Sequence, residues 1–505
     1  MKKSMVKILA LGLASVSVAS MVACGGNGGK GGDAYAEDVI EISYWSSGYG
    51  TPYLSKVIKA FEADNPDIKI SLSASSAVTT GDIYNREDDN TTDLYISTME
   101  DYLAYTDYLE PLDSVLEMEV DGVKVKDKLD SEYLNAVKAS DNKTYTLTWA
   151  EGLGGMVYNA DVFTAKGYKE PKTTTELTKL ALTMNSDKYT PFVHYKEYWN
   201  YMCWLWMAQL DGASVYQDYW KGTWTNADGT KEANSIKVFK ETETKRAVFN
   251  VLYDLLSPNG YTYTGTNTLS HTVAQTYFLN GYGLMMPNGS WVETEMQSAE
   301  STVKNIKMMK TPVISALGTK LGISENQLVA AVAYVDGDTL TSAQQSAVNA
   351  MSPETIEAVR KARNMVYSEK MGHTFLIPEY ASAKEAAKRF IAYYYSDKAL
   401  AIEETSGMML PATYSDGAKR KGAYENESTF VKSTIDLGEV CTRIYRCKTG
   451  KLLYDGGIKN FWYYDPITSF TYGNSLITVS DYFKKENSYW DGEWNNILTN
   501  ADLLG

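Results

Sequence analysis

The side chains of this sequence that could carry chemistry are mainly carboxylates and aromatic rings. The chain has 63 Asp and Glu, 39 Tyr and 11 Trp, but only 12 Phe and three His. His194, His271 and His373 belong to no His-Glu-x-x-His metal motif, and there is no Gly-x-Ser-x-Gly nucleophile motif. A Tyr or Trp ring is flat and apolar and also forms hydrogen bonds. The excess of Tyr and Trp therefore favours surfaces of the kind found in sugar-binding clefts and in protein interfaces.

Because carboxylates are plentiful, an enzyme is an alternative to a binding protein. A glycosidase needs two of them about 5 Å or about 6.5–9.5 Å apart, and the sequence is compatible with such a pair. The three motifs of a penicillin-binding enzyme are present as Ser4-x-x-Lys7, Ser140-Asp-Asn142 and Lys448-Thr-Gly450. The first lies in the targeting segment described next, which is removed, so we interpret the set as chance. An adhesin or scaffold protein should show internal repeats, and the sequence has none.

The N-terminus predicts a bacterial lipoprotein signal peptide over residues 1–23. A start with three Lys precedes an apolar run at 8–20, which is too short to span a bilayer stably. Met-Val-Ala-Cys24 then has the form of a lipobox, which makes Cys24 the predicted lipidation site. The Gly-rich residues 24–37 predict a flexible tether between anchor and domain. The alternative is an ordinary secretory signal cleaved near Ala23. With the anchor, the expected location is the outer face of the cell membrane.

Length, charge and cysteines narrow the class further. A chain of 505 residues exceeds the usual size of one core and predicts two domains. Removing the three Lys of the signal peptide takes the formal charge from −15 to −18, which disfavours binding to nucleic acid or to anionic lipid. Cys203 lies in an apolar run and is predicted to be a buried free thiol. Cys441 and Cys447 are close enough for a small disulfide, which stays open, and no cysteine spacing predicts a metal.

The first folded segment predicts the start of an open α/β sheet. Apolar residues alternate at 40–44, a turn follows at 46–50, and a helix is expected to begin at Pro52, capped by Thr51. A second alternating strand is expected at 68–72. Ligands of such sheets bind beyond the carboxyl ends of the strands, so the turn at 46–50 is the first candidate binding segment. The alternative is that the turn is only a connection.

The remaining chain predicts further strands and helices without a second low-complexity linker, which suggests that the chain crosses between two lobes more than once. Trp204 and Trp206, in the aromatic stretch 195–206, are predicted to lie in the core. Residues 216–234 are predicted to form a polar surface excursion. Further strands are expected at 93–97, 145–149 and 282–286, and a turn is expected at 287–291. Helices are expected at 161–166, 272–280 and 382–404, and another helix is expected to start at the capping box 173–176. About two helices are expected within 312–372, beginning at Thr341 and Ser352.

Several landmarks occur in one order along the chain. They are Tyr-Trp-Ser-Ser-Gly-Tyr-Gly at 44–50, Asp93-Leu-Tyr-Ile96, Gly152-Leu-Gly-Gly-Met-Val-Tyr-Asn159, Phe278-x2-Gly281-x3-Met285-x3-Gly289-x-Trp291 and Gly407-x3-Pro411. This ordered set resembles the extracellular solute-binding proteins of ABC importers, specifically the carbohydrate branch with the maltodextrin-binding proteins. The similarity covers nearly the whole mature chain, and residues 216–234 and 312–372 look like additions to the smaller members.

The resemblance implies an α/β fold of two lobes, the periplasmic-binding-protein or Venus-flytrap fold, with crossover hinge strands. Residues 38–149 and 300–405 would form lobe 1, and residues 150–299 and 406–505 would form lobe 2. The lobes would close around a sugar, and the closed monomer would dock on the transmembrane subunits of a permease. No cofactor, metal or catalytic residue is implied. A peptide ligand is the alternative within this class.

The resemblance also implies which residues contact the ligand. From lobe 1 they are the turn residues Ser46, Ser47 and Tyr49, with Glu100 and Asp101 after the third strand. Trp149 and Glu151 lie at the first crossover. From lobe 2, Tyr198 or Trp199 and Trp291 would stack on sugar rings, and Trp462 would add a C-terminal platform.

Overall fold

The computed structural model describes residues 38–75, 81–84, 90–473 and 476–504. The predicted signal peptide, the lipidation site Cys24 and the tether lie outside these residues. Within the described residues, no helix has the length and apolar character that crossing a bilayer requires.

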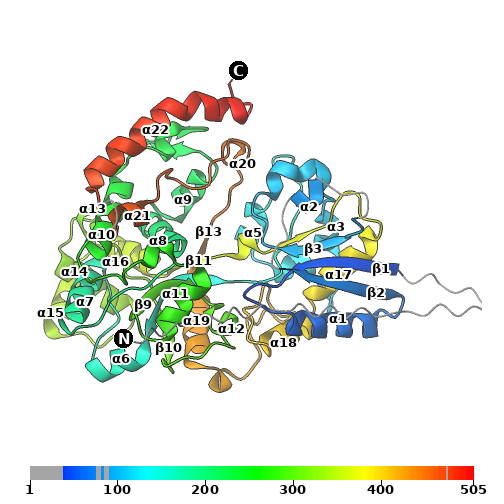
Figure 1. The fold of residues 1–505 in the computed structure, drawn as a ribbon, viewed down its shortest axis with the longest axis horizontal. Helices are drawn as coiled ribbons and strands as arrows, with labels where there is room; N and C mark the ends of the chain where they lie inside the picture. Colours follow the sequence, from blue (N-terminus) through cyan, green and yellow to red (C-terminus); the bar gives the residue numbers. More distant parts are fainter. Residues whose placement is uncertain (1–37, 76–80, 85–89, 474–475, 505) are drawn as a thin grey trace, which may run out of the picture. The chain divides into compact units, whose positions relative to one another are not determined.

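Lobe 1 is built on a four-stranded sheet in the order β12-β3-β1-β2 (Figure 1). Its strands are β1 (Asp38–Trp45), β2 (Ile68–Ser75), β3 (Leu94–Ser97) and β12 (Thr374–Leu376). β1 is parallel to β2 and β3, and β12 runs antiparallel to β3. The alternating residues Ile40, Ile42 and Tyr44 are buried, which confirms the predicted first strand. The predicted strand at 145–149 is wrong, because this segment forms only an isolated bridge from Leu147 to Phe375.

Helices cover this sheet. Lobe 1 contains α1 (Pro52–Asp64), α2 (Gly81–Tyr84), η1 (Tyr102–Tyr108), α3 (Asp113–Glu117), the hairpin β4 (Glu119–Val120) and β5 (Val123–Lys124), α4 (Val125–Lys128), α5 (Ser131–Ala136), α17 (Lys384–Tyr394) and α18 (Asp397–Glu404). α1 begins at Pro52 as predicted, but the Thr51 side chain makes no capping hydrogen bond. The helix predicted over 382–404 is two helices, because the Ser396 side chain accepts the Ala399 N–H and starts α18.

Lobe 2 has a five-stranded sheet centred on β6 (Leu153–Asn159). The other strands are β9 (Met285–Gly289), β10 (Ile306–Met309), β11 (Met365–Ser368) and β13 (Thr442–Tyr445). β9, β10 and β11 run antiparallel to β6, and β11 is parallel to β13. The predicted strand at 282–286 therefore begins later and continues through Pro287, so the turn predicted at 287–291 is wrong for its first three residues.

The sheet pairing corrects the expected lobe boundaries. Residues 300–405 were expected in lobe 1, but β10 and β11 pair with strands of lobe 2. The segment between them forms four helices instead of about two: α13 (Ala316–Lys320), α14 (Glu325–Val335), α15 (Ser342–Asn349) and α16 (Pro353–Arg363). Their apolar residues belong to the lobe 2 core, and only the part from β12 onward returns to lobe 1. Thr341 and Ser352 cap α15 and α16 as predicted.

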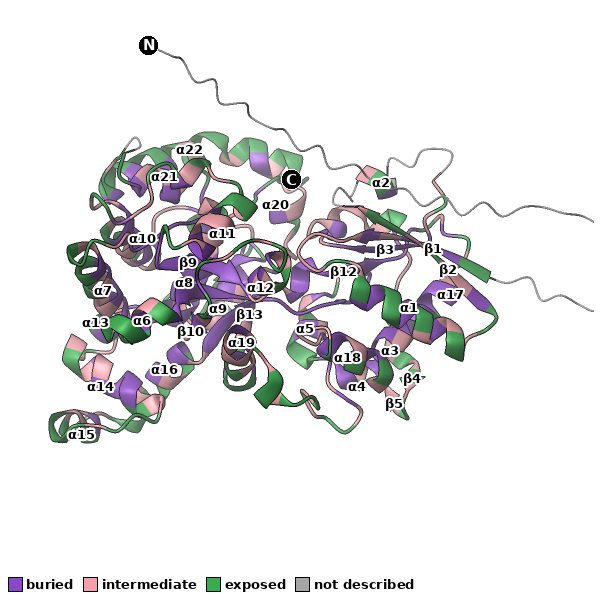
Figure 2. Cartoon of the chain, turned by 60° about the horizontal axis from the view of Figure 1, so that its bottom comes forward, coloured by how far each residue is buried: buried purple, intermediate pink, exposed green. Residues whose placement is uncertain are grey.

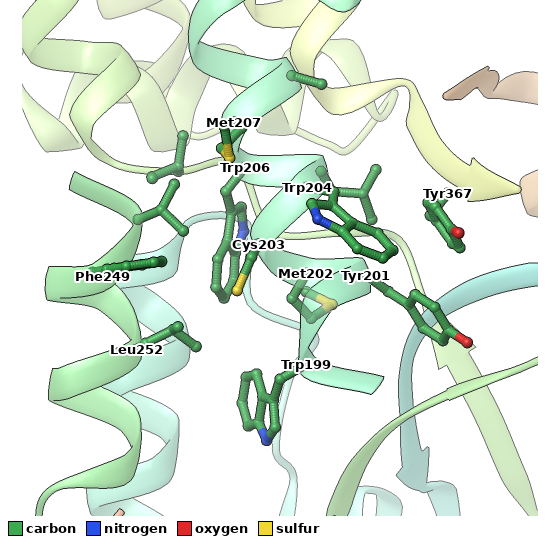
Figure 3. Close-up of a cluster of buried hydrophobic side chains, with 14 of the residues drawn as sticks. Trp199, Tyr201, Met202, Cys203, Trp204, Trp206, Met207, Phe249, Leu252 and Tyr367 are labelled. Atoms are coloured by element: carbon green, nitrogen blue, oxygen red, sulfur yellow. The ribbon is translucent and has the colours of Figure 1, made fainter. Parts of the chain in front are cut away.

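The core of lobe 2 forms around α8 (Trp199–Asp211), which is buried almost along its whole length (Figures 2 and 3). Trp204 and Trp206 are both buried, as predicted, and Trp206 extends toward Phe249. The segment 216–234 is less peripheral than predicted, because Tyr216, Tyr219 and Trp220 are buried. Its elements are α9 (Ala213–Tyr219) and a hairpin of β7 (Trp224–Thr225) and β8 (Lys231–Glu232).

The remaining elements of lobe 2 complete its outer layers. They are α6 (Ala160–Lys166), α7 (Thr174–Ser186), η2 (Lys196–Tyr198), η3 (Ile236–Val238), α10 (Glu243–Leu256), η4 (Thr266–Thr268), α11 (His271–Leu279), α12 (Val292–Glu295), η6 (Tyr424–Asn426), α19 (Thr429–Val440), α20 (Lys451–Tyr454), α21 (Pro466–Phe470) and α22 (Val479–Asn500). Thr173 caps α7, but Glu176 accepts the N–H of Lys172, so the predicted reciprocal capping box is not formed. Cys203, Cys441 and Cys447 are free buried thiols; the Cys441–Cys447 bridge considered above is absent.

Two consecutive glutamates of α18 differ in their pairing and give a stability prediction. Glu403 is fully buried, and both its oxygens lack a hydrogen-bond partner among the described residues. Burial raises the pKa of Glu403 well above its usual 4.5 despite the nearby Tyr394 hydroxyl. A carboxyl whose pKa is raised by folding stabilises the fold at acidic pH and loses this contribution as pH rises. We expect Glu403→Gln to raise the melting temperature at pH 7.5 by about 2–4 °C, with the gain vanishing near pH 4.

Glu404 provides the matched control for this measurement. It is also buried, but its carboxylate accepts hydrogen bonds from Tyr414 and from the backbone N–H groups of Lys421 and Gly422. Glu404→Gln should therefore lower the melting temperature at pH 7.5. A loss of stability for Glu403→Gln as large as that for Glu404→Gln would show that Glu403 is ionised and paired.

Candidate functional site

The turn after β1 places Tyr49 against the first crossover. Gly48 and Gly50 have left-handed φ angles of 78° and 66°, and the Gly50 N–H donates to the Ser46 carbonyl at 2.9 Å. The Tyr49 ring lies edge-on to Trp149 with centroids 4.9 Å apart, and its hydroxyl bonds His373 Nε2 at 2.8 Å. Tyr49 is half-buried, so the turn is more than a connection: it holds one aromatic ring at the junction of the lobes.

Two glycines of lobe 2 make room for Trp291. A Cβ at Gly289, the last residue of β9, would lie 2.1 Å from the Trp291 ring. A Cβ at Gly152 would lie 2.9 Å from Trp291 Cζ3 and 3.3 Å from the Tyr49 hydroxyl. Gly152 therefore marks the place where Tyr49 of lobe 1 and Trp291 of lobe 2 meet. Trp291 is half-buried and keeps part of its ring accessible.

The beginning of α8 adds two tyrosines to this place. Tyr198 and Tyr201 stack with centroids 5.4 Å apart, and each lies edge-on to Trp291, at 6.1 and 6.2 Å. Tyr201 also stacks on Tyr367 of β11 at 4.7 Å, and Figure 3 shows the two rings side by side. We call Tyr49, Tyr198, Tyr201, Trp291 and Tyr367 the aromatic cluster. Its members come from both lobes and from the returning crossover strand.

A carboxyl group lies at this cluster. Glu369 directly follows β11, and burial raises its pKa to about 7, although the nearby phenol groups of Tyr201 and Tyr367 act in the opposite direction. A Cβ at Gly372 would lie 3.4 Å from Glu369 Oε2 and 3.6 Å from Glu100 Oε1, so these two carboxyls flank the same backbone. Glu100 of lobe 1 forms an ion pair with Arg446 of lobe 2. Carboxylates and aromatic rings from both lobes therefore meet at one place.

The structure places three predicted ligand contacts in the protein core. Trp199 is fully buried and lies edge-on to Phe192 at 5.3 Å, so it is no platform, and Tyr198 takes the surface position. Trp462 is buried against Phe249 at 5.4 Å and is no platform either. Trp149 is fully buried, and its Nε1 donates to the Ser97 carbonyl at 2.8 Å. Trp149 supports Tyr49 from beneath and has no surface for a ligand.

Glu151 lies away from the aromatic cluster. Successive residues of an extended strand point to opposite faces, so Glu151 and Gly152 diverge. Glu151 accepts hydrogen bonds from Ser368 Oγ at 3.0 Å and Arg443 Nε at 3.2 Å, and Lys370 Nζ lies 3.9 Å away. It lines a pocket of about 350 Å³ between residues 407–413 and α19. Burial would raise the pKa of Glu151, but the charges of Lys370 and Arg443 hold it below its usual value.

Sequence reasoning missed Tyr201, Tyr367, Glu369 and Arg446. The spacing of Tyr198 and Tyr201 is helical and could have indicated the pair, but α8 is buried on all sides, so no amphipathic pattern marks its accessible end. Tyr367 and Glu369 carry no motif, and only the pairing of β11 with β6 brings them to the site. Ser46, Ser47 and Asp101 lie in the loops at this place, and their ligand contacts stay predictions.

Comparison with known proteins identifies the family. The family model of the bacterial extracellular solute-binding proteins matches residues 47–401. The chain belongs to this family. The matched segment starts in the turn of Tyr49 and runs into α18, so it contains all five residues of the aromatic cluster. Solute-binding proteins of this family are binding proteins rather than enzymes.

Individual proteins are similar to this chain in sequence or in fold. A multiple sugar-binding protein of Streptococcus mutans is 26% identical over 298 residues, which cover 56% of this chain and 64% of that protein, just under two thirds of its length. Among solved structures, RafE in complex with raffinose superposes with a TM-score of 0.52 and 16% identity, covering 92% of this chain and 97% of that one. RafE is a protein of Streptococcus pneumoniae. Maltose-bound MalE3 of T. maritima superposes with a TM-score of 0.56 and 16% identity, covering 92% of this chain and 100% of that one. The structural similarity supports the two-lobed fold.

Proposed function

We propose that this solute-binding protein captures an oligosaccharide at the aromatic cluster by closing its two lobes. The observation that carries the proposal is the meeting of Tyr49 from lobe 1 with Trp291 from lobe 2 at Gly152. A pyranose has an apolar face of C–H groups, which an indole or phenol ring covers, and an equator of hydroxyls, which carboxylates accept from. Half-buried rings next to Glu369 and Glu100 match both parts. The sugar-binding relative in S. mutans supports the same ligand class.

Closure follows from where the ligand contacts lie. Because Tyr49 and Trp291 belong to different lobes, a sugar contacts both only in the closed state and stabilises that state by the difference in contacts. In this proposal the closed protein delivers the sugar to the transmembrane subunits of an ABC permease. The protein would act as a monomer held at the outer face of the membrane by lipid on Cys24.

The ligand class can be tested by thermal shift with two panels, one of neutral and acidic oligosaccharides and one of short peptides. A ligand that binds only the folded state raises the free energy of unfolding, by about 2.7 kcal/mol at a concentration of 100 times its Kd, and therefore raises the melting temperature. We expect stabilisation by members of the sugar panel. Stabilisation by the peptides alone would contradict the proposal, and release of shorter sugars from the added oligosaccharide would indicate a glycosidase instead.

The raised pKa of Glu369 predicts that sugar affinity depends on pH. A group with a pKa of about 7 goes from about one tenth to about nine tenths ionised between pH 6 and 8, and the ionised form is the stronger acceptor of sugar hydroxyls. We expect the affinity for a neutral oligosaccharide to rise as pH rises, by up to about tenfold. Tyr198, Tyr201 and Tyr367 also face this carboxyl, but their raised pKa values keep them neutral in this range.

Lys448 also loses its proton near pH 7, because burial lowers the pKa of its ammonium group to about 7. The titration is therefore measured in a Lys448→Gln background, with and without Glu369→Gln. The pH dependence should persist in the single variant and disappear in the double variant. An unchanged pH profile after Glu369→Gln would exclude Glu369 as the group responsible.

A further inference from the structure

Two basic side chains of the segment after β13 are connected to the aromatic cluster through Trp204 and Glu100. The Arg446 guanidinium lies over the Trp204 ring at 5.3 Å, and Trp204 packs on Tyr367 with centroids 5.2 Å apart. Tyr367 is a member of the cluster and stacks on Tyr201. Lys448 Nζ lies 3.8 Å from Glu100 Oε2, the same oxygen that pairs with Arg446. Arg446 is thus linked to the proposed sugar site through Trp204, and both cations are linked to it through Glu100, which flanks Gly372 together with Glu369.

These cations have too few acceptors. One oxygen of Glu100 serves both Arg446 and Lys448, and at 3.8 Å it is beyond hydrogen-bond distance of Lys448. Arg446 Nε is buried and has no hydrogen-bond partner in the part of the chain that the structure describes. The side chains of Arg446 and Lys448 are only 23% and 14% exposed, so water replaces the missing acceptors incompletely. A buried cation without its full set of acceptors is costly unless a ligand supplies them.

The lowered pKa values of both cations show that their charges are poorly solvated. Burial lowers the pKa of Lys448, and the positive charges of Arg446 and Lys459 lower it further, while Asp101 opposes this. Burial also lowers the pKa of Arg446 to about 10. Glu369, the other carboxyl at the cluster, is only partly ionised at neutral pH. Two poorly solvated basic side chains thus lie together in a chain with a formal charge of −15.

We propose that the sugar bound by this protein carries a carboxylate, as in an oligosaccharide that contains a uronic acid, and that Arg446 and Lys448 bind this carboxylate. This inference rests on the proposed sugar binding and narrows it to an acidic ligand class. The guanidinium offers its unused N–H donors to the two carboxylate oxygens, and the ammonium group adds a point charge. The neighbouring sugar rings stack on Trp291 and on Tyr49 and Tyr198, the half-buried tyrosines of the cluster.

Calorimetric titration with matched sugar pairs tests the inference. One pair is a xylo-oligosaccharide with and without a glucuronic acid substituent, and the other is trigalacturonic acid and galactotriose. We expect the acidic member of a bound pair to bind at least about tenfold more tightly, with a preference that weakens as salt is added. Arg446→Gln should remove most of this preference. Lys484→Gln, which removes a charge from an exposed position of α22, should leave it unchanged.

The possible results separate the inference from the proposal on which it rests. Equal or tighter binding of the neutral members would overturn the acidic ligand class while sugar binding stands. If Arg446→Gln weakens both members of a pair equally, the Glu100–Arg446 ion pair serves only to hold the lobes together, and the inference is wrong. If no sugar of either pair binds while another, neutral oligosaccharide of the panel does, the inference is wrong and sugar binding stands. If no oligosaccharide of the panel binds, the proposed function fails and this inference fails with it.

Discussion

Glu151→Ala is expected to lower the free energy of unfolding by about 3–5 kcal/mol, the largest loss of stability that we predict for a single charged residue. Glu151 is 4% exposed and lies where the chain first crosses between the lobes. Its carboxylate faces both Arg443 and Lys370. Removing it leaves these two cations in a poorly solvated place without the carboxylate that pairs with both. The change is measured by urea denaturation at pH 7.

The same measurement at acidic pH gives an independent check. The folded-state pKa of Glu151 is below its usual 4.5, so its stabilising contribution is complete above that value and is lost as pH falls below it. The difference between wild type and Glu151→Ala should therefore shrink as pH falls below about 4.5.

Glu117→Ala is the matched control for Glu151→Ala. Glu117 also pairs with two lysines, Lys124 at 2.8 Å and Lys126 at 2.7 Å, but its side chain is 54% exposed. An exposed ion pair contributes little, so we expect no measurable loss of stability. Equal effects of the two substitutions would show that burial does not determine the importance of the Glu151 ion pairs.

Trp291→Ala is expected to reduce oligosaccharide affinity by about 30-fold, or about 2 kcal/mol, as for a central aromatic contact of an interface. The indole ring is half-buried and lies against Gly152, where it meets the Tyr49 hydroxyl of lobe 1. The affinity is measured by calorimetry. Trp494→Ala is the control, because Trp494 is also half-buried in lobe 2, against Phe239 at 5.8 Å, but belongs to α22. Trp494→Ala should lower stability without changing affinity.

Gly289→Ala tests the position of the same ring without removing it. The new methyl group would lie 2.1 Å from the Trp291 ring, closer than any real contact, so the indole must move. We expect an affinity loss comparable to that of Trp291→Ala. Unchanged affinity in both variants would show that the sugar does not stack on Trp291.

A site residue could be predicted from the sequence where a local turn positions it, but not where long-range packing does. Tyr49 lies between the two glycines of a turn, and Trp291 follows Gly289 at a recognisable spacing; the structure brings the two rings together. Trp199 and Tyr198 are adjacent in sequence, and since α8 is buried on every side, only its packing on Phe192 decides which ring is in the core. Local sequence contains no such information.

The crossover strands show the same limit. Glu151 and Glu369 both lie next to strands that connect the lobes, and each is a carboxylate close to aromatic residues in sequence. Strand alternation turns Glu151 away from Gly152, while the pairing of β11 with β6 brings Glu369 to Tyr201. Residues 306–368 were expected in lobe 1, but the sheet pairing places them in lobe 2. These are long-range contacts, which residue patterns alone do not specify.

The central claim, capture of an oligosaccharide between the lobes without turnover, is tested most directly by one calorimetric titration of the purified protein, followed by analysis of the recovered sugar. We predict saturable binding of one sugar per protein at roughly micromolar affinity, on the order of −8 kcal/mol, with the sugar recovered intact. Absence of binding by every oligosaccharide of the panel, or recovery of cleaved sugar, would contradict the account.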